Sequence, residues 1–256
     1  MRDVESEVGR IGLGTWQTFP ALDRVLPLFV KLGGQLVDSS PMYGRAESVI
    51  GDVATRHVLR DRLFIATKVW TRGREAGIAQ MEESERKLGG RIDLMQVHNL
   101  VDADTHLETL RAWKREGRVR FIGVTHYTAS AYRELARYLD RGGIDFVQLN
   151  YSVAERDAER RILPLAEERG IRVLINRPFG EGSLLRALRG KPLPPFASEL
   201  GCASWAELLL KFVFSHPAVT CAIPATSNPD HLRQNMSAAG GPMPDAAMRQ
   251  RIAEAV

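Results

Sequence analysis

Three ionisable side chains stand at the ends of short apolar runs, and each is followed directly by a loop. Asp38 follows Leu36-Val37, Lys68 follows Ala66-Thr67, and His98 follows Gln96-Val97. Such runs are typical of strands buried on both faces of a parallel sheet, where an unpaired charge is costly. Because the carboxyl ends of the strands of a closed barrel meet at one mouth, we expect these side chains to share one site there.

A tyrosine in the loop after Asp38 adds a hydroxyl group to this set. The ordinary pKa of tyrosine, about 10, makes Tyr43 a poor acid at neutral pH. The Lys68 ammonium beside it would lower that pKa, and Asp38 would keep Lys68 charged and oriented. His98 could donate a hydrogen bond to a carbonyl oxygen. The four residues predict a proton donor for an oxygen that gains negative charge, as reduction of a carbonyl group by hydride requires.

Each residue also has a simpler interpretation when taken alone. Asp38 could cap a helix, Tyr43 could anchor a loop, Lys68 could be a solvated strand end, and His98 could be a hydrogen-bonded core residue. Their joint occurrence near successive strand ends favours a site. No other strand end offers a Ser or Cys nucleophile with a His base, and neither a P-loop nor a G-x-G-x-x-G fingerprint occurs in the chain.

The elements around these residues alternate between strand and helix. The chain has 256 residues, close to the roughly 250 that a (β/α)8 barrel uses. We predict one α/β domain over residues 1–256, a single (β/α)8 TIM barrel. The expected strands are 11–16, 35–38, 63–67, 93–97, 119–124, 146–149, 172–175 and 219–223. The expected helices are 21–32, 47–57, 75–88, 105–115, 128–139, 158–168 and 205–214, with two more beginning near Asn228 and Asp245. Residues 180–195 are expected to form a long loop.

The composition excludes several classes of protein. The net charge is +4, but basic residues alternate with acidic ones, so we expect no nucleic-acid partner, whereas a phosphorylated small molecule would suit the charge. The two cysteines show no metal-ligand spacing and no disulfide framework, which indicates a reducing compartment and no metal site. No apolar signal core or membrane-length run is present, so we expect a cytoplasmic protein without a membrane partner.

The motif Val37-Asp38-Ser39-Ser40-Pro41-Met42-Tyr43-Gly44, followed by Thr67-Lys68 and Val97-His98, closely resembles the aldo-keto reductase family. The resemblance extends from Ile11-Gly12-Leu13-Gly14 to Leu232-Arg233-Gln234-Asn235. It implies a (β/α)8 barrel that binds a nicotinamide dinucleotide, usually NADPH, without a Rossmann domain. It also implies that Tyr43 is the general acid, tuned by Lys68 and Asp38, and that His98 orients the carbonyl of a small-molecule substrate.

The resemblance also implies cofactor contacts along the chain. The first-strand loop, matched by Gly14, Thr15 and Trp16, would border the nicotinamide and the substrate, and Thr125, His126 and Gln148 after strands five and six would hold the carboxamide. The loop after strand seven, matched by Arg177, Pro178, Phe179 and Gly180, would cross the pyrophosphate. The segment after strand eight would surround the adenosine phosphate and adenine, and its matching residues are Ala225, Thr226, Ser227, His231, Gln234 and Asn235.

Several positions depart from the family pattern. Thr125-His126 stands where many members have Ser-Asn, and Asn176 matches an aromatic residue that stacks on nicotinamide. Ala225 and His231 match the usual Lys and Arg near the adenosine phosphate. Arg is a better bidentate phosphate ligand than His, so the loss of this Arg weakens the expected preference for NADPH over NADH. We therefore expect NADPH, the usual cofactor of the family, with NADH also possible. The chain has no long segment after the last helix, which predicts a wide substrate mouth lined by Trp16, Met42 and Trp70.

Two other functions are compatible with these residues. A nucleotide-binding regulatory subunit could hold the cofactor as a redox sensor with little or no turnover. A barrel aldolase could use Lys68 as a Schiff-base nucleophile, although Asp38 nearby would keep Lys68 charged and therefore unreactive. The family resemblance implies a monomer or a weak homo-oligomer.

Overall fold

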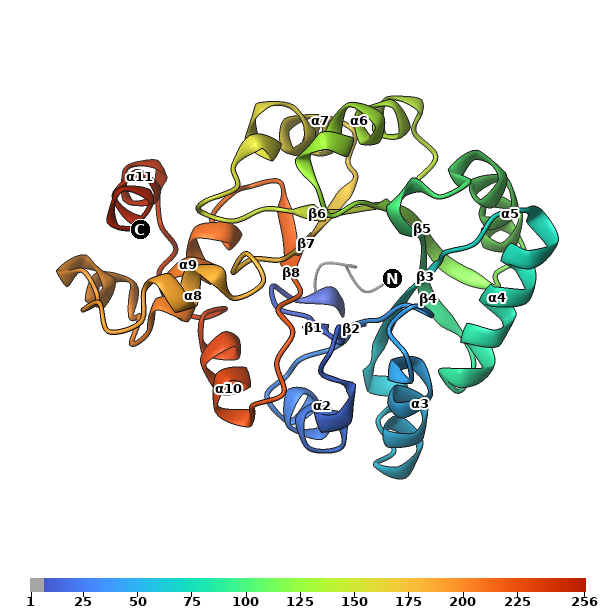
Figure 1. Ribbon diagram of the computed structural model, residues 1–256, viewed down its shortest axis with the longest axis horizontal. Helices are drawn as coiled ribbons and strands as arrows, with labels where there is room; N and C mark the ends of the chain where they lie inside the picture. The colour runs from blue at the N-terminus through green and yellow to red at the C-terminus, as the bar shows by residue number, and fades with distance from the viewer. Residues whose placement is uncertain (1–6) are drawn as a thin grey trace.

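Eight parallel strands form a closed ring in the computed structural model, which describes residues 7–256 (Figure 1). Neighbouring strands follow the order of the chain. The last strand returns to the first through the bridges Ile11–Ala222 and Gly14–Ala225. The predicted (β/α)8 barrel is therefore confirmed. The strands are β1 (Leu13–Gly14), β2 (Leu36–Asp38), β3 (Phe64–Val69), β4 (Ile92–Val97), β5 (Val119–Thr125), β6 (Phe146–Asn150), β7 (Arg172–Asn176) and β8 (Val219–Ala222).

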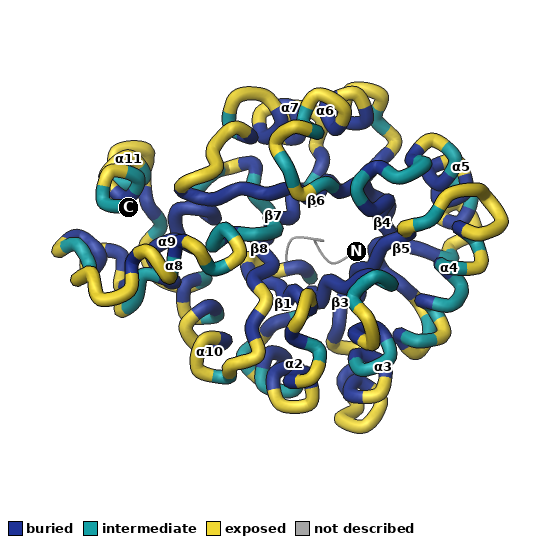
Figure 2. Tube along the Cα trace, in the orientation of Figure 1, coloured by how far each residue is buried: buried dark blue, intermediate teal, exposed yellow. Residues whose placement is uncertain are grey.

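The helices around the ring turn their apolar faces toward it, with buried positions on the inside and exposed positions on the outside (Figure 2). The last helix, residues 246–255, lies outside this layer and contacts the helix of residues 205–214. No helix within residues 7–256 has the length and apolar character needed to span a bilayer. The helices are α2 (Leu22–Lys31), α3 (Ala46–Arg56), α4 (Arg74–Lys87), α5 (Ala103–Arg115), α6 (Tyr132–Arg141), α7 (Ile162–Glu168), α8 (Ser183–Ala187), α9 (Trp205–Phe214), α10 (Pro229–Ser237) and α11 (Ala246–Ala255).

The starts of the last helices are set by side-chain caps. Ser204 and Glu207 form a capping box at α9, which satisfies amide groups that the first turn of a helix leaves unbonded. Asn228 accepts a hydrogen bond from Asp230 N at α10, and Asp245 accepts one from Met248 N at α11. The helix starts predicted near Asn228 and Asp245 are confirmed.

The structure corrects four of the expected elements. The helix expected over residues 158–168 begins at Ile162, after a short 3-10 helix. Residues 180–195 do not form one loop, because α8 lies within them and places Leu184 and Leu188 against the core. The two leucines are four residues apart, as on one face of a helix, but flanking glycines and prolines hide the pattern. The helix expected from residue 128 begins at Tyr132, after a short 3-10 helix. The first strand is shorter than expected.

Side chains inside the barrel follow the two-residue period of a strand. Rings from non-adjacent strands meet there: Phe64 of β3 lies 5.9 Å from Phe121 of β5 and 6.2 Å from Phe146 of β6, between ring centroids. Lys68 lies four residues after Phe64 on β3, and Gln148 lies two residues after Phe146 on β6. Because side chains alternate along a strand, both also point into the barrel, nearer its carboxyl end. The interior therefore passes from aromatic at the amino-terminal end to polar at the mouth.

A close contact between α3 and α4 gives a test of this packing. A Cβ atom added at Gly51 would lie 2.0 Å from Lys87 O on α4. Replacing a helical glycine by alanine usually stabilises a protein by about 0.5–1 kcal/mol. Here we expect Gly51→Ala to lower the free energy of unfolding, measured in urea, by about 1–3 kcal/mol, because the backbones must separate. The neighbouring exposed position serves as the control, and Asp52→Ala should stay within about 0.5 kcal/mol of wild type. Stabilisation by Gly51→Ala would contradict the contact.

Candidate active site

A buried ion pair stands at the centre of the barrel mouth. Lys68 Nζ lies 2.6 Å from Asp38 Oδ2, and the two side chains are 0% and 3% exposed. Lys68 also donates to Ser39 O at 2.8 Å. Burial lowers the pKa of Lys68, but Asp38 and Tyr43 outweigh it and leave this pKa above its usual value. Lys68 is therefore held charged, which argues against its use as a Schiff-base nucleophile.

Two amide side chains complete the coordination of Asp38. Gln148 Nε2 donates to Asp38 Oδ1 at 2.8 Å, and Gln96 Nε2 donates to the same oxygen at 3.2 Å. These donors compensate the Asp38 carboxylate for the water that it loses on burial. Gln96 was not among the predicted site residues, although it stands two positions before His98 on the same interior face. This two-residue spacing is the signal that could have identified it.

Tyr43 lies beside this pair, as the sequence predicted. Lys68 Nζ is 5.2 Å from the centroid of its ring, and the rings of Trp16 and His98 pack against it at 5.0 and 6.0 Å. Burial raises the pKa of Tyr43, whereas Lys68 lowers it and Asp38 raises it, so that this pKa lies above its ordinary value. The expected net lowering of this pKa was wrong, because desolvation outweighs the nearby ammonium.

His98 is a neutral imidazole at the same mouth. It is 5% exposed, and burial, together with the charges of Lys68 and His126, lowers the pKa of His98 to about 3. Its Nδ1 atom lies 3.0 Å from Ser40 Oγ. With the Ser40 hydroxyl donating to Nδ1, the ring proton sits on Nε2, where it can be donated to a carbonyl oxygen. Ser40, which the sequence suggested only as a turn residue, thus contacts a predicted site residue, and donation by its hydroxyl would select this tautomer.

The predicted pocket residues Trp16 and Trp70 flank these groups. Both rings remain over 40% exposed, at 44% and 43%. Trp16 packs on Tyr43, and the ring of Trp70 lies 6.4 Å from that of His98. Two large aromatic surfaces thus border the mouth, where an apolar part of a ligand can be covered. Met42 is half-buried, and its amide lies 3.4 Å from Ser40 Oγ.

The residues predicted to hold the nicotinamide carboxamide lie on β5 and β6. Thr125 pairs in register with Gln148, and His126 N donates to Gln148 O at 3.0 Å. The charge of His126 contributes to the lowered pKa of His98, so this loop lies near His98. Gln148, however, already uses its amide nitrogen on Asp38. Thr15 is similarly engaged, since its hydroxyl donates to Asp38 O and Ser39 Oγ.

The loop after β7 supplies a cation next to the site. The Arg177 guanidinium lies 4.3 Å from the centroid of the Tyr127 ring and forms an ion pair of 2.7 Å with Glu181. Its charge also lowers the pKa of Tyr43, although by less than burial raises it. Pro178 is buried, and Phe179 and Gly180 are half-buried in the same loop. A cation at this position has the chemistry that the pyrophosphate of a dinucleotide requires.

The segment after β8 lies beside the first strand. Ala225 forms a bridge with Gly14, and Thr226 Oγ1 accepts a hydrogen bond from Asn228 N at 3.1 Å. The four exposed members of this predicted group are Ala225, Ser227, His231 and Gln234, while Thr226 and Asn235 are buried. The residues present thus fit the pyrophosphate through Arg177, whereas Ala225 and His231 offer no permanent cation for an adenosine phosphate.

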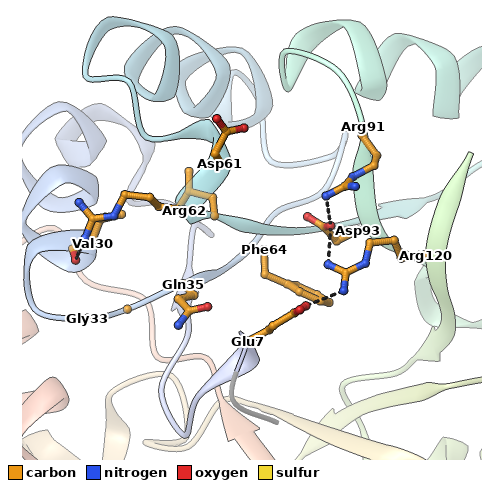
Figure 3. Close-up of a pocket in the computed structure, with 12 residues that line it drawn as sticks. Glu7, Val30, Gly33, Gln35, Asp61, Arg62, Phe64, Arg91, Asp93 and Arg120 are labelled. Carbon is orange, nitrogen blue, oxygen red and sulfur yellow. Dashed lines mark hydrogen bonds and ion pairs between the residues drawn. The ribbon is translucent and has the colours of Figure 1, made fainter. Parts of the chain in front are cut away.

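A cavity of about 460 Å³ opens at the opposite, amino-terminal end of the barrel (Figure 3). Four of the six charged side chains that line it form ion pairs with one another. Asp93 Oδ1 accepts from Arg91 and Arg120, each at 3.1 Å, and Arg120 also pairs with Glu7 at 2.6 Å. Because these groups are satisfied internally and lie away from Tyr43 and Lys68, we assign this cavity to the structural base of the barrel.

The low pKa of His98 predicts a pH dependence of stability. In the unfolded chain a histidine titrates near its ordinary pKa of 6.5, whereas folded His98 titrates at about 3. Between these values the unfolded state binds more protons, so acidification favours unfolding by up to about 1.4 kcal/mol per pH unit. The contribution of His98 to the free energy of unfolding is fully present above about pH 6.5. We expect His98→Asn to flatten the fall of the unfolding free energy between about pH 6.5 and about pH 5. Parallel curves for both proteins would contradict a buried neutral His98.

Comparisons with known proteins agree with this geometry. The model of the aldo/keto reductase family matches residues 10–254. Methylglyoxal reductase YeaE of Escherichia coli is 28% identical over 242 residues, which cover 88% of this chain and 83% of that protein. An NADH-specific methylglyoxal reductase of the same organism is 28% identical over 217 residues, covering 69% and 65% of the two chains.

A solved structure shows the same fold with a ligand bound. The crystal structure of an aldo/keto reductase from Klebsiella pneumoniae in complex with NADP and acetate is similar to this chain with a TM-score of 0.82 and 26% identity. The similarity covers 97% of this chain and 91% of that one. Together with the family match over nearly the whole chain, these findings show that the protein belongs to the aldo/keto reductase family.

Proposed function

We propose that this protein reduces an aldehyde or ketone with a nicotinamide dinucleotide, using Tyr43 as the general acid. The observation that carries the proposal is the buried Lys68–Asp38 pair beside the Tyr43 ring, with neutral His98 in edge contact with the same ring at 6.0 Å between centroids. The relatives named as methylglyoxal reductases and the neighbour bound to NADP support the same reaction class.

The roles of the four residues follow from their charges. When bound, the dinucleotide supplies the hydride. His98 donates a hydrogen bond from Nε2 to the substrate oxygen and so orients the carbonyl group. Tyr43 gives its proton to that oxygen as negative charge develops there. Lys68 stabilises the phenolate that remains, and Asp38 keeps Lys68 charged and in place.

The cofactor is proposed to be NADPH, with NADH as a possible substitute. A neighbour holds NADP, and one relative is named as NADH-specific. Arg177 would bind the pyrophosphate, which both cofactors share, and Thr125 and His126 would border the nicotinamide. We further propose that the enzyme works in a reducing compartment such as the cytoplasm, because Cys202 and Cys221 are buried free thiols.

Replacing the acid tests the central role. We expect Tyr43→Phe to lower kcat at least about 100-fold while the Kd of NADPH stays within a factor of about two, since only proton donation is lost. Turnover is followed by NADPH absorbance with para-nitrobenzaldehyde or butanedione as substrate. Tyr138→Phe on α6 is the control and should retain full activity. Tight binding of NADPH by the wild type without turnover of either substrate would favour a redox-sensing regulatory subunit instead.

Replacing the proposed pyrophosphate ligand tests cofactor binding. A hydrogen bond to a charged group contributes about 1.5–3 kcal/mol, so Arg177→Met should weaken binding roughly ten-fold or more. We expect equal losses for NADPH and NADH in fluorescence titrations, because the pyrophosphate is common to both. The exposed Arg186 of α8 offers a matched control, and Arg186→Met should leave both affinities unchanged. A loss confined to NADPH would place Arg177 at the extra phosphate instead.

A further inference from the structure

A buried carboxylate lies just outside the barrel, behind the residues described above. Glu47 of α3 is 2% exposed. Its Oε1 atom accepts a hydrogen bond from Thr67 Oγ1 at 2.6 Å, and its Oε2 atom accepts one from Ser84 Oγ at 3.1 Å. Burying a carboxylate is costly unless hydrogen bonds compensate for the loss of water. The two hydroxyl groups supply that compensation from two different elements, β3 and α4.

The sequence positions of these partners connect them to the active site. Glu47 is four residues after Tyr43, and the Tyr43 loop runs directly into the first turn of α3, where Ala46 N donates to Tyr43 O. Thr67 immediately precedes Lys68. Because side chains alternate along a strand, Thr67 faces the helices while Lys68 faces the barrel interior. The Thr67–Glu47 hydrogen bond therefore joins the segment that carries Tyr43 to the strand that carries Lys68.

Ser84 has no such connection. It lies on α4, fully buried, and its hydroxyl completes the hydrogen bonding of the second Glu47 oxygen. The same carboxylate thus has one partner next to a catalytic residue and one partner remote from the site. This asymmetry separates a role in positioning from a role in stability alone.

We propose that Glu47 is a positioning residue that fixes Tyr43 relative to Lys68 through its hydrogen bond to Thr67. The inference rests on the proposed function, since it assumes that Tyr43 is the acid. Lys68 influences the hydroxyl of Tyr43 by charge, and this influence falls as the two groups separate. Displacements of about 1 Å in an active site lower rates by up to about 100-fold. A hydrogen bond outside the barrel can therefore tune the chemistry inside it.

The test compares two variants that each remove one hydroxyl donor from Glu47. We expect Thr67→Val to lower kcat about ten-fold and to move the alkaline limb of the kcat–pH profile to higher pH, because a more distant Lys68 lowers the pKa of Tyr43 less. Ser84→Ala should lower the melting temperature by a similar amount but leave both kcat and the pH profile unchanged. Thr67→Ser retains the donor and should restore the wild-type profile.

Each outcome decides the question. Equal changes in kcat and pH profile for Thr67→Val and Ser84→Ala, or an unshifted alkaline limb for Thr67→Val, would overturn the positioning role and leave Glu47 a purely structural residue. NADPH affinity, measured by fluorescence in all variants, should stay constant. Tyr43→Phe is assayed in parallel: if it retains turnover, the proposed function itself fails, whatever the Thr67 variants show.

Discussion

The rest of the mouth depends on the ion pair between Lys68 and Asp38. A charged group without water or a partner would be strongly destabilising at 0% exposure, and removing one member of a buried pair typically costs about 3–5 kcal/mol. Further hydrogen bonds satisfy the pair: Lys68 donates to Ser39 O, and Asp38 accepts from the side chains of Gln96 and Gln148. These contacts draw β2, β3, β4 and β6 together at their carboxyl ends and give the mouth one geometry.

The aromatic side chains at the amino-terminal end of the barrel offset the free-energy cost of burying polar groups at its mouth. Phe64, Phe121 and Phe146 meet across the interior at centroid distances of 5.6–6.2 Å, and they bury a large apolar area on the same strands that carry Lys68, Thr125 and Gln148. Because two-residue alternation governs both ends, one strand contributes an apolar side chain at the base and a polar one at the mouth. Stability and chemistry are thus separated along the barrel axis.

Much of this arrangement could be predicted from the sequence, since apolar runs ending in Asp38, Lys68 and His98 locate the strand ends and the repeated unit indicates a barrel. Two kinds of feature could not. The pKa of Tyr43 depends on how deeply the folded chain buries its side chain, and the local sequence pattern does not give that depth. Likewise, the engagement of Gln148 by Asp38 and of Ser40 by His98 joins residues 110 and 58 positions apart, through contacts that only the closed barrel creates.

The charge on Lys68 also explains why the two candidate proton donors take different roles. A protonated His98 would face the Lys68 ammonium in a buried site, so both burial and that charge keep the imidazole neutral. The same ammonium also lowers the pKa of Tyr43, because it favours the phenolate anion. One fixed cation therefore disfavours the charged form of the histidine and favours the charged form of the tyrosine, as the roles proposed for the two residues require. The neutral histidine keeps an N–H group, which suits the role proposed for it in orienting a carbonyl oxygen, and Tyr43 remains the proposed proton donor.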